Sequence, residues 1–292
     1  NARVVITRKS LLRKILSIKD NLPLLERILV VDIDEDQSEF VLSLKNLLQD
    51  AEQDFDFPHH VDPETPAFLQ YTSGSTGKPK GALHVHDALQ DMQKSFKEIM
   101  QLEMDDLYWC TADPAWITGL VYGIIAPFST GARQLQYNGT YNADNWLRIL
   151  ERDKVTVWYT APTALRMLMQ EEAAKFEQYD FSNLKRMYSV GEPLNPEIYF
   201  WGKKVFNVEV YDNWWQSETG SMMIANRPPM VVKPGSMGKP RVGVEPLICS
   251  EAMELMPPGK QGLLCLRRVW GSMFRNYFRN EAAYADKFRG DI

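Results

Sequence analysis

The sequence predicts an α/β fold with mixed, mostly parallel sheets flanked by helices, followed by a smaller β-rich region. Between residues 142 and 211, segments with helical periodicity alternate with short apolar segments in a βαβαβ order, which favours a parallel sheet. From about Asn226 onward, Pro and Gly recur between short apolar runs, a pattern typical of short strands and tight turns. We therefore expect an α/β region over residues 1–225 and a barrel-like subdomain over residues 226–292.

Individual elements of the α/β region follow from periodicity and end signals. Asn142 is expected to cap one helix, a second is expected from about Thr163 to Lys175, and Asn195 is expected to cap a third, with Pro in its first turn. The strands of the series are predicted at residues 156–160, 186–190 and 208–211. Ligands of such sheets bind where the loops after the strands gather, which points to the segments after each of these strands.

Composition and charge exclude several classes of protein. The 292 residues are 45% hydrophobic and 24% charged, which is typical of globular chains. A net charge of -5 without a long basic cluster argues against a nucleic-acid partner. No apolar run approaches the roughly 18 residues of a membrane span, and the N-terminal residues lack the apolar region of a signal peptide. We therefore expect a soluble, cytoplasmic protein with no membrane partner.

A glycine-rich segment, YTSGSTGKPKG at residues 71–81, directly follows an apolar, strand-like run. It departs from the common GxxxxGK[ST] phosphate loop, because Thr72 stands at the first Gly position and Pro79 follows Lys78. Residues 81–86 also have an extended pattern, so the loop is expected to join two strands rather than to open a helix. Its glycines, hydroxyls and lysines can still surround phosphate groups. A phosphate-binding loop is therefore predicted, with a flexible surface hairpin as the alternative.

Four further segments stand in order along the chain: TADPAWITG at 111–119, YTAPTA at 159–164, GEP at 191–193 and YDNWWQSETG at 211–220. Together with the glycine-rich loop they resemble the motifs of the adenylate-forming superfamily, which includes acyl-CoA synthetases, luciferases and peptide-synthetase adenylation domains. Within it, the last two segments are similar to those of the acetyl-CoA synthetase family. The resemblance covers most of the chain and implies the large N-terminal domain of the adenylate-forming fold.

The resemblance implies an AMP-forming acetate–CoA ligase. A carboxylate would attack the α-phosphate of ATP, giving an acyl-adenylate and pyrophosphate, and CoA would then take the acyl group and release AMP. The implied ATP- or AMP-binding residues are Thr72, Ser73, Gly74, Ser75, Thr76, Gly77, Lys78, Gly191, Glu192, Pro193, Asp212, Asn213, Trp214, Trp215, Gln216 and Ser217. Thr72, Lys80 and Glu218 are implied as catalytic residues, and Glu218 as the residue associated with Mg²⁺. Charge neutralisation and positioning would be the main tasks of these groups.

Trp215 is expected to determine the choice of acid. An indole in the acyl pocket fills the volume that a longer chain needs, so acetate is the expected substrate, with propionate as the nearest alternative. The other implied walls of the pocket are Ile117, Thr118 and Val190. By resemblance, CoA would lie near Thr118 and Ala161. The alternative structural role is that Trp214 and Trp215 are core aromatics.

Other interpretations stay open from the sequence alone. They are a propionyl- or medium-chain acyl-CoA synthetase, a nucleotide-binding module without activity, and a P-loop ATPase or GTPase, which Pro79 disfavours. The chain starts without Met and ends before the family's ribose-binding Asp and C-terminal domain, so we expect a fragment with weak or no activity. His84 and His86 share a strand face, but no third ligand has a spacing that suits a metal.

Overall fold

The computed structural model describes residues 2–49, 51, 61–72, 78–267, 270–290 and 292. The chain divides into two compact units, residues 1–60 and residues 61–292. The division near residue 60 falls in the Pro-rich segment that precedes the glycine-rich loop. The boundary predicted between residues 225 and 226 stays a prediction.

The first unit is a small parallel sheet in the order β1–β2–β3. Its elements are β1 (Val4–Thr7), α1 (Lys9–Leu16), the 3-10 helix η1 (Lys19–Asn21), β2 (Arg27–Val30), β3 (Val41–Ser43) and α2 (Leu44–Gln49). Leu12 of α1 packs with Ile28 and Val30 of β2 in a separate hydrophobic core. The unit thus buries apolar side chains of its own, as an independent structural element does.

The larger unit is organised around a seven-stranded sheet in the order β12–β11–β10–β9–β8–β6–β7. Its strands are β6 (Tyr108–Cys110), β7 (Gln134–Leu135), β8 (Val157–Thr160), β9 (Arg186–Ser189), β10 (Val210–Trp214), β11 (Ile224–Ala225) and β12 (Lys239–Pro240). Parallel pairing joins the five strands β7, β6, β8, β9 and β10, in that order across the sheet, whereas β11 and β12 pair antiparallel. The predicted mixed, mostly parallel sheet is confirmed.

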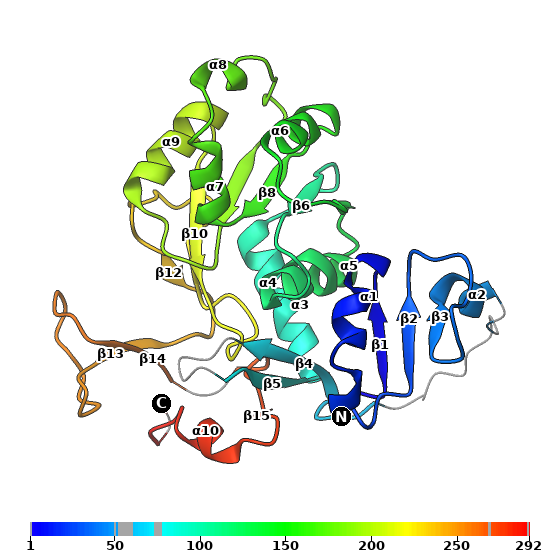
Figure 1. The fold of residues 1–292 in the computed structure, drawn as a ribbon. Coiled ribbons are helices and arrows are strands. Elements are labelled where there is room, and N and C mark those ends of the chain that lie inside the picture. The colour runs from blue at the N-terminus through cyan, green and yellow to red at the C-terminus, as the bar shows by residue number, and fades with distance from the viewer. Residues whose placement is uncertain (1, 50, 52–60, 73–77, 268–269, 291) are drawn as a thin grey trace. The chain divides into compact units, whose positions relative to one another are not determined.

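Helices cover both faces of this sheet (Figure 1). They are α3 (Asp87–Met100), α4 (Ile117–Leu120), the π-helix η2 (Val121–Ile125), α5 (Ala126–Thr130), α6 (Ala143–Arg152), α7 (Pro162–Leu168), α8 (Ala173–Phe176) and α9 (Pro196–Phe206). In β8, Trp158 packs with α6, α7 and α9, while its neighbours Val157 and Tyr159 pack with α3 and η2. Alternate side chains thus enter two cores, which explains why all four residues of the strand are buried. No helix in the described part of the chain is long and apolar enough to cross a membrane.

The glycine-rich segment lies between two antiparallel strands, β4 (Pro66–Thr72) and β5 (Lys80–Val85). Thr72 and Lys80 are the last pair of the hairpin, and residues 73–77 lie outside the described residues. A third strand, β15 (Asn276–Tyr277), pairs with the other edge of β5. The prediction that this loop joins two strands, and does not open a helix, is confirmed.

The strands after residue 225 belong to several sheets. β12 extends the large sheet and β15 extends the hairpin, while β13 (Pro246–Cys249) and β14 (Leu263–Leu266) pair only with each other among the described residues. A short helix, α10 (Glu281–Ala285), follows β15. A barrel-like subdomain is therefore not confirmed, because these strands are distributed between sheets.

One predicted helix is interrupted. The helix expected from Thr163 to Lys175 ends at Leu168 as α7, and α8 begins only at Ala173. The break lets Phe176 turn into the core, where its ring lies edge-on to Trp201 with 5.6 Å between the ring centroids. Tertiary packing of an aromatic side chain therefore overrides a helical pattern in the sequence.

Of the two predicted helix caps, Asn142 makes a capping hydrogen bond and Asn195 does not. Asn142 caps α6 as expected, because its Oδ1 accepts a hydrogen bond from the backbone N–H of Asn145 at 2.9 Å. Asn195 occupies the N-cap position of α9 with an extended backbone, but its side chain makes no capping hydrogen bond. The start of α9 thus depends on Pro196 at its first position.

Candidate functional site

The carboxyl ends of β6, β8, β9 and β10 meet at one edge of the large sheet, where ligands of open parallel sheets bind. The loops that follow these strands contain residues 111–116, 161, 190–195 and 215–223. Side chains link neighbouring strand ends: Thr111 Oγ1 donates to Thr160 Oγ1 at 2.7 Å, and Asn213 Nδ2 donates to Ser189 O at 2.8 Å. The edge is therefore a connected framework, and it carries most of the residues that the sequence predicted as functional.

A cavity of about 680 Å³, the β9–β10 cavity, opens at the ends of these two strands. One wall consists of predicted nucleotide-binding residues, namely Gly191, Glu192, Pro193, Asp212, Asn213, Trp214, Trp215 and Gln216. The opposite wall is formed by residues 233–237. Residues from two separate motifs thus face one space, and no sequence pattern had indicated residues 233–237.

A second cavity of about 630 Å³, the β6–β8 cavity, lies at the ends of β6 and β8 beside the start of α4. It brings together all the residues predicted for the acyl pocket and CoA, which are Ile117, Thr118, Ala161, Val190 and Trp215. Ser217 also lines this cavity rather than the β9–β10 cavity. The two cavities adjoin, because Gly191, Glu192, Trp215 and Gln216 line both of them.

Trp215 is both a core residue and a cavity wall. It is only 9% exposed, and its ring packs edge-on against Tyr122 with 4.9 Å between the ring centroids. Tyr122 is itself fixed, because its hydroxyl accepts from the backbone N–H of Met222 at 2.7 Å and pairs with Ser95 Oγ at 2.7 Å. Trp214, by contrast, is half-buried and lines the β9–β10 cavity. A rigid indole at position 215 therefore limits the volume where the two cavities meet.

Glu192 links the loop after β9 to the start of α7. Its carboxylate accepts hydrogen bonds from the backbone N–H of Thr163 at 2.7 Å, from the Thr163 hydroxyl and from the Arg166 guanidinium. Burial would raise the pKa of Glu192, but the hydrogen bonds from Thr163 and Arg166 outweigh it and hold the pKa below its usual value. The side chain therefore stays charged and holds the wall of both cavities in place.

Asp212 differs from Glu192 because it is buried with no cation beside it in the described part of the chain. It is 6% exposed, and its Oδ1 has no hydrogen-bond partner among the described residues. Burial raises the pKa of Asp212 to about 6, although hydrogen bonds from Leu194, Asn213 and Ser189 partly oppose the shift. A buried carboxyl that lines a cavity and has one oxygen without a partner among the described residues is the kind of group that a bound ligand satisfies.

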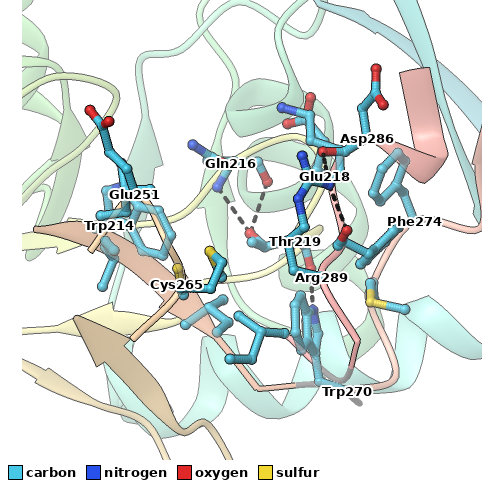
Figure 2. A pocket seen from close by; sticks show the side chains of 18 residues that line it. Trp214, Gln216, Glu218, Thr219, Glu251, Cys265, Trp270, Phe274, Asp286 and Arg289 are labelled. Carbon is cyan, nitrogen blue, oxygen red and sulfur yellow. Dashed lines mark hydrogen bonds between the residues drawn. The ribbon is translucent and has the colours of Figure 1, made fainter. Parts of the chain in front are cut away.

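Glu218 lines a third cavity, of about 420 Å³, together with Trp214 and Gln216 (Figure 2). The hydroxyl of Tyr277 donates a hydrogen bond to Glu218 Oε1. The Nζ of Lys80 lies 5.5 Å from the centroid of the same tyrosine ring. The predicted metal-associated acid and a predicted phosphate-binding lysine are thus brought together through Tyr277, which the sequence alone did not identify.

The glycine-rich loop is described only at its ends. Thr72 and Lys80 are paired at the end of the hairpin, Lys78 is exposed, and Ser73, Gly74, Ser75, Thr76 and Gly77 lie outside the described residues. Gln70 of β4 reaches the loop after β6, since its Nε2 donates to Ala115 O at 2.7 Å. The hairpin is therefore attached to the same sheet edge as the two adjoining cavities.

His84 supports the backbone beside Glu218. Its ring is buried, stacks on Phe68 with 4.8 Å between the centroids, and donates from Nε2 to Ser217 O at 2.8 Å. Burial lowers the pKa of His84 to about 4, so the ring is neutral at pH 7. In the residues described, no group of three or more His, Cys, Asp or Glu could hold a metal ion.

The comparisons with known proteins agree with this arrangement. A family model described as "AMP-binding enzyme" matches residues 1–278. The chain belongs to the AMP-binding enzyme family. The family resemblance seen in the sequence is therefore confirmed.

Several curated relatives of this AMP-binding enzyme are acetyl-coenzyme A synthetases. The chain is 41% identical to that of Bacillus subtilis over 98% of this chain and 50% of the relative. It is 40% identical to that of Deinococcus radiodurans over 80% of this chain and 37% of the relative. The chain thus spans about half, or less, of the length of these relatives.

A solved structure supports the fold assignment. The crystal structure of the anthranilate CoA ligase AuaEII in complex with anthranoyl-AMP is 29% identical in sequence and has a TM-score of 0.87. The match covers 99% of this chain and 55% of that protein. The chain therefore has the adenylate-forming fold that its sequence predicted.

Proposed function

We propose that the chain carries the ATP- and acyl-binding part of an AMP-forming acetyl-CoA synthetase. The observation that carries this proposal is the pair of adjoining cavities, which share Gly191, Glu192, Trp215 and Gln216. Such a pair suits a reaction in which a small acid must reach the α-phosphorus of a bound nucleotide. The carboxylate would attack the α-phosphate, so that an acyl-adenylate forms and pyrophosphate leaves.

The β9–β10 cavity suits the adenine and ribose part of ATP. The 191–193 backbone forms one side, and Gly191, with a φ of +93°, has a conformation that other residues rarely adopt. The unpartnered carboxyl oxygen of Asp212 can accept a hydrogen bond from an exocyclic amino group. A base held there would bring its phosphates toward the shared residues Trp215 and Gln216.

The triphosphate would lie beside Thr72, Lys78 and Lys80. Glu218 fits a role in holding Mg²⁺: Tyr277 occupies one carboxylate oxygen, and no other hydrogen bond to this carboxylate is seen among the described residues. Mg²⁺ commonly binds through one or two carboxylates plus phosphate oxygens, so a single acid is sufficient. The ion would supply positive charge that offsets the charge on the leaving pyrophosphate.

The acyl group would occupy the part of the β6–β8 cavity next to Trp215. Ile117, Thr118 and Val190 line the same space, and the indole of Trp215 would occupy volume that a longer acyl chain needs. Acetate is therefore the proposed acid. The remaining volume, toward Thr118 and Ala161, is the proposed approach for the CoA thiol, whose attack would release AMP.

These assignments make small molecules the proposed partners: ATP, with Mg²⁺, acetate and CoA. The net charge of -5 gives no basis for nucleic-acid binding. A cytoplasmic location is proposed because these substrates are found there. The names of the curated relatives support the choice of acetate, and the short span of the chain relative to them makes weak turnover the expected result.

The test is exchange of labelled pyrophosphate into ATP by this chain, with acetate, propionate, butyrate and octanoate compared, together with calorimetric titration of ATP. We expect ATP binding and weak exchange that is fastest with acetate. Exchange that is fastest with octanoate would instead indicate a longer-chain synthetase. ATP binding with no exchange for any acid would favour a nucleotide-binding module, and release of ADP rather than AMP would contradict the whole assignment.

A further inference from the structure

Tyr277 makes the one side-chain hydrogen bond to the Glu218 carboxylate that is seen in the described part of the chain. The two residues are far apart in sequence, since Glu218 follows β10 and Tyr277 belongs to β15. Neither the sequence motifs nor the family model's description assigns a role to Tyr277. The proposal that follows rests on the function proposed above, in which Glu218 acts on the Mg²⁺ of the nucleotide.

The position of the Tyr277 hydroxyl is tightly determined. The side chain is 1% exposed, and its backbone pairs with Ala82 in the hairpin that carries the glycine-rich loop. The Tyr277 ring lies against Phe274, with 4.8 Å between the ring centroids. Lys80 Nζ lies 5.5 Å from the centroid of the Tyr277 ring. The ring is therefore held on several sides, and its hydroxyl has little freedom to leave the carboxylate.

The segment around Tyr277 also holds the backbone of the Glu218 loop. The backbone N–H of Phe274 donates to Glu218 O at 3.0 Å, Trp270 Nε1 donates to Thr219 O at 2.8 Å and Ser272 Oγ donates to Thr219 O at 2.7 Å. Ser272 is anchored in turn, because its hydroxyl also lies 2.7 Å from Asp91 Oδ2. The backbone is thus fixed by several bonds, and Tyr277 adds the one that acts on the carboxylate.

We propose that Tyr277 is a positioning residue that orients the Glu218 carboxylate toward the magnesium–nucleotide complex. By donating to Oε1, it fixes the rotation of the carboxyl group and leaves the other oxygen for the cation. Groups that hydrogen-bond to a metal-binding carboxylate in this way fix its geometry. A tyrosine hydroxyl ordinarily keeps its proton at neutral pH, so it can remain a donor to this carboxylate.

The test compares Tyr277→Phe with Tyr188→Phe as a matched control. Tyr188 is also buried, and its hydroxyl donates to Ile99 O at 2.8 Å, away from the residues of the three cavities at the strand ends. Each variant removes one buried hydroxyl and keeps the ring. The affinity of the chain for ATP is measured by calorimetry in excess Mg²⁺ and in EDTA. The quantity compared is the affinity in Mg²⁺ divided by the affinity in EDTA.

We expect Tyr277→Phe to lower this ratio about tenfold, with the affinity in EDTA unchanged, and Tyr188→Phe to leave the ratio as it is. In a Glu218→Gln background, Tyr277→Phe should cause no further change, because it acts through that carboxylate. An unchanged ratio in Tyr277→Phe, or an equal fall in Tyr188→Phe, overturns the proposal while the proposed function stands. If the native chain binds no ATP under either condition, the proposed function fails and this inference fails with it.

A thermal denaturation scan of each variant separates positioning from folding. Both variants lose one buried hydrogen bond, so a similar small fall in melting temperature is expected for the two. A Tyr277→Phe chain that is unfolded at the temperature of the titration would show that the hydroxyl is needed for the fold, and would overturn the positioning role.

Discussion

Two buried aspartates, one at each end of the large parallel sheet, have opposite electrostatic surroundings. Asp106 lies just before β6 at the amino end, 1% exposed, with Arg186 at 2.6 Å and Lys185 at 2.9 Å. Burial alone would raise the pKa of Asp106, but its hydrogen bonds and the two cations lower it. Asp212 at the carboxyl end is buried to a similar degree, has no such cation in the described residues, and has its pKa raised to about 6.

The difference fits the proposed function, in which the sheet is stabilised at one end and binds a ligand at the other. At the amino end two cations, Arg186 and Lys185, offset the charge of Asp106, although Arg186 Nε has no hydrogen-bond partner among the described residues. At the carboxyl end Asp212 has no such cation in the described part of the chain, and adjoining cavities open beside it. A buried carboxyl that faces a cavity without a cation marks a place where a ligand can supply the missing contacts.

The largest effect is expected for Asp106→Asn. It removes the anion from a buried pair and leaves Arg186 without its partner, so the free energy of unfolding at pH 7 should fall by about 3 kcal/mol. Urea denaturation measures this change, and calorimetry should find the affinity for ATP unchanged. A loss of ATP affinity with little loss of stability would show that the amino end takes part in binding.

A smaller effect, dependent on pH, is expected for Asp212→Asn. The folded-state pKa of about 6 lies above the ordinary value of 3.8, so the native chain loses stability as pH rises through this window. The variant cannot lose a proton there. The free energy of unfolding of the variant, taken relative to that of the native chain, should therefore rise by about 2 kcal/mol from pH 4.5 to pH 7.5. Urea denaturation at the two pH values measures this change. An equal stability difference at both pH values would show that Asp212 carries no raised pKa.

The smallest effect concerns selectivity at the meeting point of the cavities. Trp215→Gly should shift the relative affinity for octanoyl- over acetyl-sulfamoyl adenosine, stable mimics of the acyl-adenylates, by about tenfold toward the longer chain. Trp214→Gly is the matched control, because Trp214 lines the β9–β10 cavity but not the acyl side. Similar shifts in the two variants would mean that Trp215 is not a wall of the acyl pocket.

Much of the fold could be predicted from the sequence because the signals are local. The β4 and β5 strands, the cap at Asn142 and the parallel order of β8, β9 and β10 all follow from periodicity and end residues. The break after Leu168 could not be predicted, since it depends on where Phe176 packs in three dimensions.

The candidate site could be predicted only where its residues lie in contiguous motifs. The GEP segment and the segment from Asp212 to Gln216 indeed face one cavity. Tyr277, by contrast, contacts Glu218 only because β15 pairs with β5, and a two-residue strand leaves little signal in a sequence. Residues 233–237 were also missed, because they lie in an irregular segment between β11 and β12 and reach this cavity only through the tertiary structure.

The most direct test of the difference between the two ends is hydrogen–deuterium exchange of the chain with and without acetyl-sulfamoyl adenosine. We expect the mimic to slow exchange at the carboxyl end, in peptides that contain residues 160–164, 190–193 and 211–219. Peptides that contain residues 103–108 and 184–187 at the amino end should be unaffected. Protection confined to the amino end, or absent from both ends at a saturating concentration of the mimic, would contradict the assignment of the site.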